Sequence, residues 1–162
     1  MMRLADDKQA DLLLPYLEGE HAAYWASAQD REGCTMLMRA AANGTRRVAK
    51  ACLRAGANPD SQDARGRSVV HVLAVARPFP KQMELLEYVV SRGASTELQD
   101  LEGLSPLMLA AREGRADSCE ALLRSLAKGR VVDARRRSAL HLACENSKTS
   151  AVRVLIRDDP KV

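Results

Sequence analysis

Residues 101–114 read LEGLSPLMLAAREG, and three other segments of this 162-residue chain align with them. The others are REGCTMLMRAAANG from Arg31, ARGRSVVHVLAVAR from Ala64 and ARRRSALHLACENS from Ala134. The third position of each segment is Gly33, Gly66, Gly103 or Arg136, and these residues follow one another at spacings of 33, 37 and 33 residues. Self-similarity at a period of this length indicates an array of stacked structural repeats. The second repeat is four residues longer than its neighbours.

Each repeat opens with a turn and then a helix start. Asp-x-x-Gly sequences begin at Asp30, Asp63 and Asp100, where Asp bonds its own backbone and Gly accepts a positive φ. Two residues after the glycine position stands a good N-cap, and these caps are Thr35, Ser68, Ser105 and Ser138. The apolar residues that follow keep helical spacing. We therefore expect the first helix of each repeat to begin at that cap.

A second apolar helix follows a break in each repeat. Its segments are VAKACL, LLEYVV, SCEALL and AVRVLI, and Gly56 and Gly93 close the first two as a left-handed C-terminal glycine would. The chain is 46% hydrophobic but only 3% aromatic, so we expect a core of closely packed aliphatic helices. The unit is thus turn, helix, break, helix, and the predicted fold class is all-α.

These units resemble the ankyrin repeat. Its signature, Thr-Pro-Leu-His-x-Ala-Ala followed later by Leu-Leu-x-x-Gly-Ala, returns in degenerate form as TMLMRAA, SVVHVLA, SPLMLAA and SALHLAC. The resemblance covers about residues 30–162, and it departs from the signature where Met38 and Met108 replace His and Arg136 replaces Gly. It implies an ankyrin-repeat solenoid of stacked helix pairs, whose concave face of hairpin turns and first helices binds another protein.

The period divides the chain into an N-terminal segment and four repeats. Residues 1–29 do not fit the signature, and we expect a helical cap or a decayed repeat there, its first helix interrupted or restarted at Pro15. Tyr24 and Trp25 would pack on the first repeat or, alternatively, form an exposed aromatic pair at a binding surface. The repeats are expected at 30–62, 63–99, 100–132 and 133–162, the last being either a C-terminal cap or a truncation.

No catalytic motif stands out. The chain has no phosphate-binding loop, nucleophile elbow or paired-carboxylate motif. His71 and His141 share one signature position, so each is expected to hydrogen-bond near its hairpin. Cys52 and Cys144 fall on apolar helix positions, where we expect inert core residues. Cys34 on a hairpin and Cys119 on a second helix are candidates for exposure. The sequence therefore predicts no enzyme activity, no cofactor and no metal site.

The charge and the chain ends bear on location and partner. The net charge of +4 and the pI near 9.0 give a mild preference for acidic partners. Asp6, Asp7 and Asp11 stand where a secretory signal would be basic, and no apolar run approaches the roughly 20 residues that span a bilayer. We expect a soluble monomer in the cytoplasm, with a nuclear location also compatible. Nucleic acid is a less favoured partner, because glutamates interrupt the basic face.

By the resemblance to ankyrin proteins, exposed residues of the hairpins and first helices carry recognition. The residues predicted to bind a partner are Arg31, Glu32, Arg39, Asn43, Arg65, Arg67, Leu101, Glu102, Leu104, Arg112, Glu113, Arg135 and Arg137, with Phe79 as a further candidate. Leu101 and Leu104 are apolar between arginines, so a partner with an apolar anchor and acidic flanks would match. Alternatively, both leucines stack on adjacent hairpins and the arginines keep the protein soluble. The predicted function is a non-catalytic adaptor or regulatory subunit, or else an ankyrin domain of a larger scaffold.

The only phenylalanine stands in ARPFPK, residues 76–81, together with the four-residue insertion near 77–80. Pro78 disfavours helix at Arg77, and Pro80 suits the first position of the following helix. The favoured interpretation is that the ring of Phe79 folds onto the helix ends of an adjoining repeat. The alternative is that Phe79 extends the recognition surface at the edge opposite the hairpins.

Overall fold

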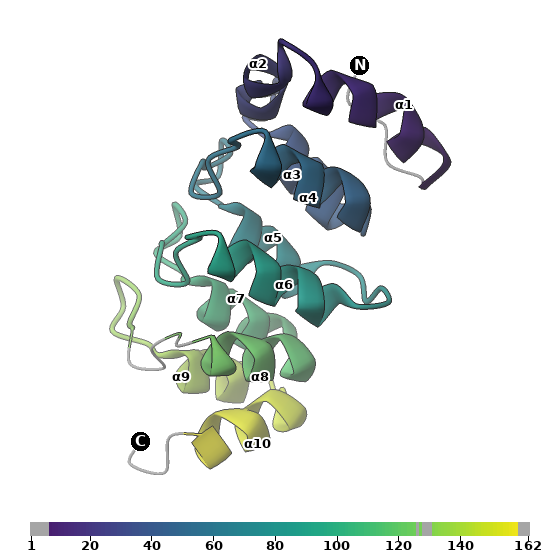
Figure 1. Cartoon of the computed structure of the whole chain (residues 1–162). Helices are drawn as coiled ribbons and strands as arrows, with labels where there is room; N and C mark the ends of the chain where they lie inside the picture. Colours follow the sequence, from purple (N-terminus) through teal and green to yellow (C-terminus); the bar gives the residue numbers. More distant parts are fainter. Residues whose placement is uncertain (1–6, 126, 128–130, 159–162) are drawn as a thin grey trace.

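The computed structural model describes residues 7–125, 127 and 131–158. Within them the chain forms ten α-helices and one isolated antiparallel bridge, Gln29 to Thr35. The helices, labelled in Figure 1, are α1 (Asp7–Glu18), α2 (Ala22–Ser27), α3 (Met36–Ala42), α4 (Arg46–Arg54), α5 (Val69–Val75), α6 (Gln82–Ser91), α7 (Pro106–Glu113), α8 (Ala116–Arg124), α9 (Ala139–Glu145) and α10 (Thr149–Asp158). The predicted all-α fold class is confirmed.

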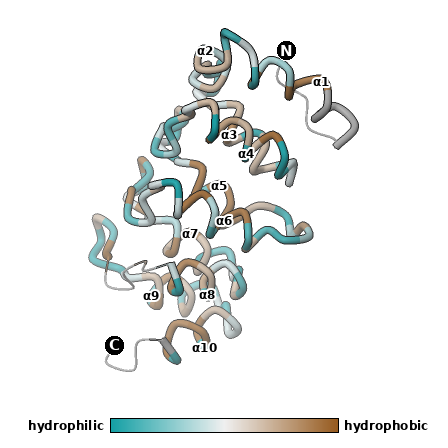
Figure 2. The backbone as a smooth tube through the Cα atoms, in the orientation of Figure 1, coloured by the Kyte–Doolittle hydropathy of each residue, from teal (hydrophilic) through white to brown (hydrophobic). Residues whose placement is uncertain are grey.

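The helices stack in two rows (Figure 1). The first helices of the repeats, α3, α5, α7 and α9, pack on one another in that order, and α8 of the second row packs between α6 and α10. At the N-terminal end α1 packs on α4, and α2 packs on α3. Hydrophobic residues concentrate in the helices, whereas the hairpins and the 76–81 loop are mostly hydrophilic (Figure 2). The stack is therefore a solenoid with its core between successive helix pairs, as predicted.

The predicted helix starts are confirmed. Thr35 and Ser105 accept hydrogen bonds from the backbone N–H groups of Met38 and Met108. Ser68 and Ser138 form capping boxes in which a histidine takes the place of the usual Glu or Gln. Such caps satisfy N–H groups that the first helical turn leaves without partners.

The N-terminal segment differs in two ways from the expectation. Pro15 does not interrupt the first helix, because α1 (Asp7–Glu18) continues on both sides of this proline. The ring of Pro15 is exposed, so water can bond the carbonyl group that the missing N–H leaves free. Trp25 packs against the core as expected, but Tyr24 is 68% exposed and meets the indole edge on, with ring centroids 5.3 Å apart. Leu4, an apolar residue of the predicted N-terminal helix, lies outside the described residues.

The cysteines also differ from their expected places. Cys52 is buried as predicted, but so are Cys34 and Cys119, and Cys144 is exposed. Cys119 is covered because α8 lies between α6 and α10, and Cys144 lies on α9, the last first-row helix in the described part of the chain. Burial raises the pKa of the Cys52 thiol and of the Cys119 thiol, each to about 12. Both therefore stay protonated and unreactive at neutral pH.

The 76–81 loop joins α5 to α6 at the edge opposite the hairpins (Figure 1). Helix α5 ends at Val75, and α6 begins at Gln82 rather than at Pro80, with Lys81 as N-cap at φ 63°. Phe79 packs against the core and lies over Gly44 of the preceding repeat, where a Cβ would be 2.8 Å from its Cγ atom. This contact agrees with the interpretation that the ring covers the helix ends of the adjoining repeat.

Replacing Phe79 with alanine is expected to lower the free energy of unfolding by about 1.5 kcal/mol, since a fully buried Phe contributes roughly 1.5 to 3 kcal/mol and this ring is only partly buried. Urea denaturation followed by circular dichroism measures the loss. Arg77→Ala is the matched control, because Arg77 is exposed in the same loop. An unchanged stability for Phe79→Ala would show that the ring does not support the stack.

Candidate functional site

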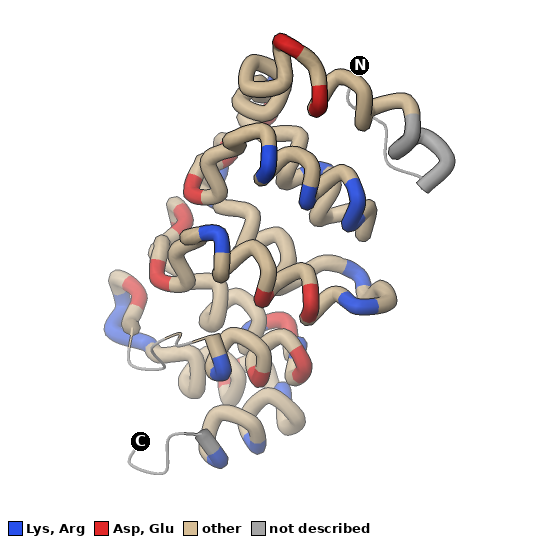
Figure 3. The backbone as a smooth tube through the Cα atoms, in the orientation of Figure 1, with Lys and Arg blue, Asp and Glu red and all other residues tan. Residues whose placement is uncertain are grey.

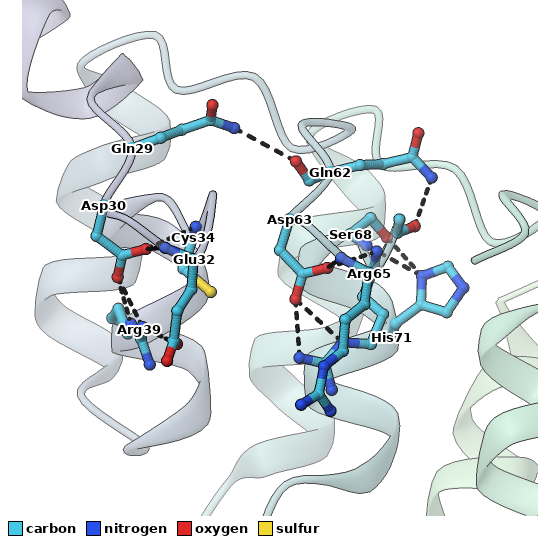
Figure 4. A network of polar contacts seen from close by, with 12 residues as sticks. Gln29, Asp30, Glu32, Cys34, Arg39, Gln62, Asp63, Arg65, Ser68 and His71 are labelled. Carbon is cyan, nitrogen blue, oxygen red and sulfur yellow. Dashed lines mark hydrogen bonds and ion pairs between the residues drawn. The ribbon is translucent and has the colours of Figure 1, made fainter. Parts of the chain in front are cut away.

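Each hairpin is organised around its aspartate (Figure 4). Asp63 Oδ1 accepts hydrogen bonds from the N–H groups of Arg65 and Arg67 at 2.8 and 2.9 Å, and Oδ2 accepts two more from the Arg67 guanidinium at 3.0 and 2.8 Å. Asp133 and Arg137 repeat the arrangement. Burial alone would raise the pKa of Asp63, but the bonds from Arg67 and Arg65 outweigh it and hold the pKa below its ordinary range. The aspartates therefore act as fixed anions that shape the hairpins.

The first hairpin gathers three groups that could ligate a metal ion, namely Asp30, Glu32 and Cys34. The guanidinium of Arg39 already bonds both carboxylates, with Nη2 2.7 Å from Asp30 Oδ2. Burial raises the pKa of the Cys34 thiol. The protonated thiol and the two carboxylates paired with one arginine form a structural ion-pair cluster.

A ladder of glutamines joins the hairpins and was missed at the sequence level. The side-chain amide of Gln29 donates to the Gln62 carbonyl at 3.3 Å, that of Gln62 to the Gln99 carbonyl at 3.2 Å, and that of Gln99 to the Val132 carbonyl at 3.0 Å (Figure 4 shows the first step). Each glutamine directly precedes a hairpin aspartate, so the repeat alignment itself carried the signal. The ladder adds to the backbone hydrogen bonds that join successive hairpins, from the Ala64 N–H to the Glu32 carbonyl and from the Leu101 N–H to the Arg65 carbonyl, both at 2.9 Å.

His71 connects the second repeat to the third. Its Nδ1 atom accepts a hydrogen bond from the Ser68 N–H at 3.1 Å, so Nε2 carries the proton and donates to the Leu104 carbonyl at 3.0 Å. Burial, aided by Arg67, lowers the pKa of His71 against the opposing effects of the Leu104 carbonyl and Asp100. The expected hydrogen bonding near the hairpin is confirmed for His71, and for His141 through Ser138.

Lowering the pH below about 6.5 is expected to destabilise the protein through His71. Above that pH the His71 side chain is neutral in both the folded and the unfolded protein. Below it the imidazole is protonated in the unfolded chain but stays neutral in the folded one, so the free energy of unfolding decreases as the pH is lowered. The slope from one group is at most about 1.4 kcal/mol per pH unit. Urea denaturation at about pH 7.5, 6.5 and 5.5 measures it. His71→Met, which copies Met38 and Met108, should flatten the slope.

The concave face contains a cavity of about 460 Å³ between the second and third repeats. It is bounded by the two hairpins and by the ends of α5 and α7, and its lining residues are Ala64, Arg65, Arg67, Val75, Asp100, Leu101, Glu102, Leu109, Arg112, Glu113 and Arg115. Leu101 is 80% exposed at the hairpin tip, while Leu109 on α7 is only 5% exposed. The cavity thus combines apolar groups with a charged rim.

Six of the predicted partner-binding residues line this cavity, namely Arg65, Arg67, Leu101, Glu102, Arg112 and Glu113. The others lie in the first repeat, in the fourth or in the inserted loop, and they are Arg31, Glu32, Arg39, Asn43, Arg135, Arg137 and Phe79. The expectation for Leu104 is wrong: it is only 2% exposed, because it stands at the base of its hairpin beneath α7. Leu101 therefore presents an apolar side chain to solvent, whereas Leu104 belongs to the core.

Several arginines of this face are already paired. Arg67 and Arg137 are bound to their hairpin aspartates, and Arg112 Nη1 lies 2.7 Å from Glu102 Oε2. Arg65 and Arg135 are exposed on the hairpin tips, and only their backbone N–H groups bond the aspartates. The sequence did not indicate that Val75, Leu109 and Arg115 line the cavity, because their place there depends on how far apart successive first helices lie.

Among the described residues, none of the helices has both the length and the apolar character needed to cross a bilayer.

Known proteins match this architecture. A family model described as ankyrin repeats in three copies matches residues 72–162, and a model of the single ankyrin repeat matches residues 32–64. Rabankyrin-5 of Mus musculus is 33% identical over 140 residues, 86% of this chain and 11% of its own length. Neurogenic locus notch homolog protein 1 of Danio rerio is 29% identical over 153 residues, which are 94% of this chain and 6% of its own length. Inversin of Canis lupus familiaris is 31% identical over 136 residues, which are 83% of this chain and 12% of its own length. The chain thus spans about a tenth of the length of these relatives.

The first of these matches covers more than half of the chain, and the second adds residues 32–64. The all-helical stack of helix pairs in the described residues is consistent with them. The chain belongs to the ankyrin-repeat family.

Proposed function

We propose that this chain is a non-catalytic adaptor or regulatory module that binds another protein through its concave face. Ankyrin repeats in general bind other proteins, and the cavity between the second and third repeats supports that role here. The observation that carries the proposal is Leu101, which holds an apolar side chain 80% exposed at the rim of this cavity. An exposed leucine beside a cavity with apolar walls is where a partner side chain gains the most contact.

The partner we propose has an apolar anchor flanked by acidic residues. The anchor would enter between Leu101 and the wall formed by Leu109 and Val75. Carboxylates that flank the anchor would bind Arg65 and Arg135, which are exposed on the hairpins of the second and fourth repeats. Arginines already bound to aspartate or glutamate would contribute less, because a new carboxylate must compete with an existing one.

Affinity capture tests this proposal. The immobilised chain is incubated with cell lysate, and retained proteins are quantified by mass spectrometry for the wild type, Leu101→Ala and Arg65→Ala. Ile156→Ala is the matched control, because Ile156 is a 52% exposed apolar residue on α10, away from the concave face. We expect a specific protein to be lost with Leu101→Ala and reduced with Arg65→Ala, but kept with the control. A partner retained equally by all variants would contradict the concave site.

A salt titration of binding separates a protein partner from nucleic acid. Binding to unrelated DNA or RNA that weakens steeply with salt would favour a nucleic-acid-binding protein instead. Selective retention of one protein at physiological salt would support the proposed adaptor. We further propose that the module acts as a monomer, which light scattering during size-exclusion chromatography would test.

A further inference from the structure

A second surface lies at the edge opposite the hairpins, where the 76–81 loop projects from the stack (Figure 1). We name it the loop patch and define it as Arg46, Arg77, Phe79, Lys81 and Glu84. The loop carries the insertion that distinguishes the second repeat from the other three. None of its residues lines the concave cavity.

The loop is held in one shape. Phe79 lies over Gly44, the Gln82 N–H donates to the Phe79 carbonyl at 3.2 Å, and the Gln82 side chain donates to the Leu73 carbonyl at 2.7 Å. Pro78 restricts the backbone further. Lys81 adopts the left-handed region at φ 63°, which a side chain other than glycine rarely does without support from its surroundings. A loop already ordered in this way loses little entropy when it binds a partner.

The loop patch has an excess of positive charge. Arg46 Nη1 and Lys81 Nζ approach the two carboxylate oxygens of Glu84 at 3.5 and 3.4 Å, and Arg77 is exposed in the same loop. Figure 3 shows this basic colouring on the projecting loop and along α4. Two of the three cations therefore share one carboxylate, and both of their contacts with it are long for charge-assisted hydrogen bonds.

We propose that the loop patch binds an acidic peptide segment of another protein. Carboxylates of the segment would engage Arg77 and share Lys81 and Arg46 with Glu84, while the ring of Phe79 and the exposed Pro78 and Pro80 give apolar contacts. A nucleic acid strand fits less well, because it needs a long continuous basic track. The track is interrupted by the exposed Glu87 on α6 and the exposed Asp117 on the adjoining α8.

Fluorescence anisotropy tests the proposal, with a labelled peptide of about ten residues, half of them glutamate, at low salt. The double variant Arg77→Glu with Lys81→Glu is expected to weaken binding at least about fivefold. The matched control is Arg54→Glu with Arg92→Glu, which makes the same change in net charge at the far ends of α4 and α6. The control should weaken binding by less than about twofold.

Glu84 offers a sharper test in the opposite direction. Glu84→Gln removes the carboxylate that competes with the peptide, so it should strengthen binding about threefold. Glu87→Gln changes the net charge equally on the same helix but should have a much smaller effect, because it releases neither Arg46 nor Lys81. Circular dichroism and thermal unfolding establish that every variant is folded.

Several results would overturn the proposal. Equal losses for the loop variant and its charge-matched control would mean that only the net charge attracts the peptide. An unchanged affinity for Glu84→Gln would place the peptide elsewhere. A single DNA strand that competes as well as the peptide does would make the surface a general polyanion site. Because Leu101→Asp alters only the concave face, it should leave peptide binding intact, so the two proposed surfaces succeed or fail separately.

Discussion

Replacing Gly66 with alanine is expected to lower the free energy of unfolding by about 3 kcal/mol, roughly 2 kcal/mol more than the same change at Gly56. Both glycines have a positive φ, 75° and 89°, so both variants carry the backbone strain of a left-handed alanine. At Gly66 the new Cβ would also lie 2.9 Å from the Leu101 nitrogen, which is too close for unbonded atoms. The third hairpin would have to move away, and the 2.9 Å hydrogen bond from the Leu101 N–H to the Arg65 carbonyl would weaken.

Urea denaturation of the purified variants measures these losses. Gly56→Ala and Gly93→Ala are the matched controls, because no atom lies within 4 Å of the Cβ that either would gain. Gly103→Ala should resemble the controls, since its nearest new neighbour is the Ala134 nitrogen at an ordinary 3.5 Å. If all four variants lost the same stability, the close contact between the second and third hairpins would not matter.

The same geometry explains the residue that breaks the repeat signature. Arg136 occupies the glycine position of the fourth repeat and adopts the same conformation, with φ 63°. No further hairpin follows it in the described part of the chain, so the Arg136 Cβ meets no backbone of the kind that lies against Gly33 and Gly66. A side chain there carries only the backbone strain.

Most of the fold could be predicted because its signals are local. The Asp-x-x-Gly turn, the N-cap and the small apolar residues of each first helix act within about ten residues, and four copies in register made the alignment reliable. Pro15 is a local signal that failed. Its position is exposed, so the helix could continue past a residue that usually ends one.

The candidate site was predicted only in part, because it depends on distances between repeats. Leu101 and Leu104 look alike in sequence, yet one is exposed at the hairpin tip and the other is buried at its base. Ion pairing was also invisible to the alignment: Arg65 and Arg67 differ in whether the guanidinium folds back onto Asp63. The side-chain amides of Gln62 and Gln99 bond a carbonyl of their own hairpin and one in the next repeat, and the second contact depends on how the repeats stack.

Asp63→Ala is expected to lower the free energy of unfolding by about 2 to 4 kcal/mol at neutral pH. The Asp63 side chain is 2% exposed and accepts four hydrogen bonds, so its removal leaves two backbone N–H groups without their acceptor and Arg67 without its counterion. The Arg67 side chain is 29% exposed and can turn towards water, which keeps the loss below that of a fully buried pair. Asp63→Asn keeps the Oδ1 acceptor and should cost about half as much.

Asp100→Ala isolates the contribution of the arginine. The Asp100 carboxylate accepts the N–H groups of Glu102 and Leu104, but Leu104 stands where the second repeat has Arg67. The loss at Asp100 should therefore be smaller than the loss at Asp63 by roughly 1 to 2 kcal/mol, the contribution of hydrogen bonds between charged groups. Equal losses at the two positions would show that the arginine adds nothing to the hairpin.

The pH dependence of the Asp63→Ala effect gives an independent check. The folded pKa of Asp63 lies below its ordinary value of 3.8, so the stabilisation is complete above that pH and is lost as the pH falls through the folded pKa. Urea denaturation from neutral pH down to about pH 3 should therefore show the difference between wild type and Asp63→Ala shrinking only in the most acidic samples. A difference that disappeared between pH 7 and pH 5 would mean that the ionised carboxylate of Asp63 is not what holds the hairpin, because Asp63 remains charged throughout that range.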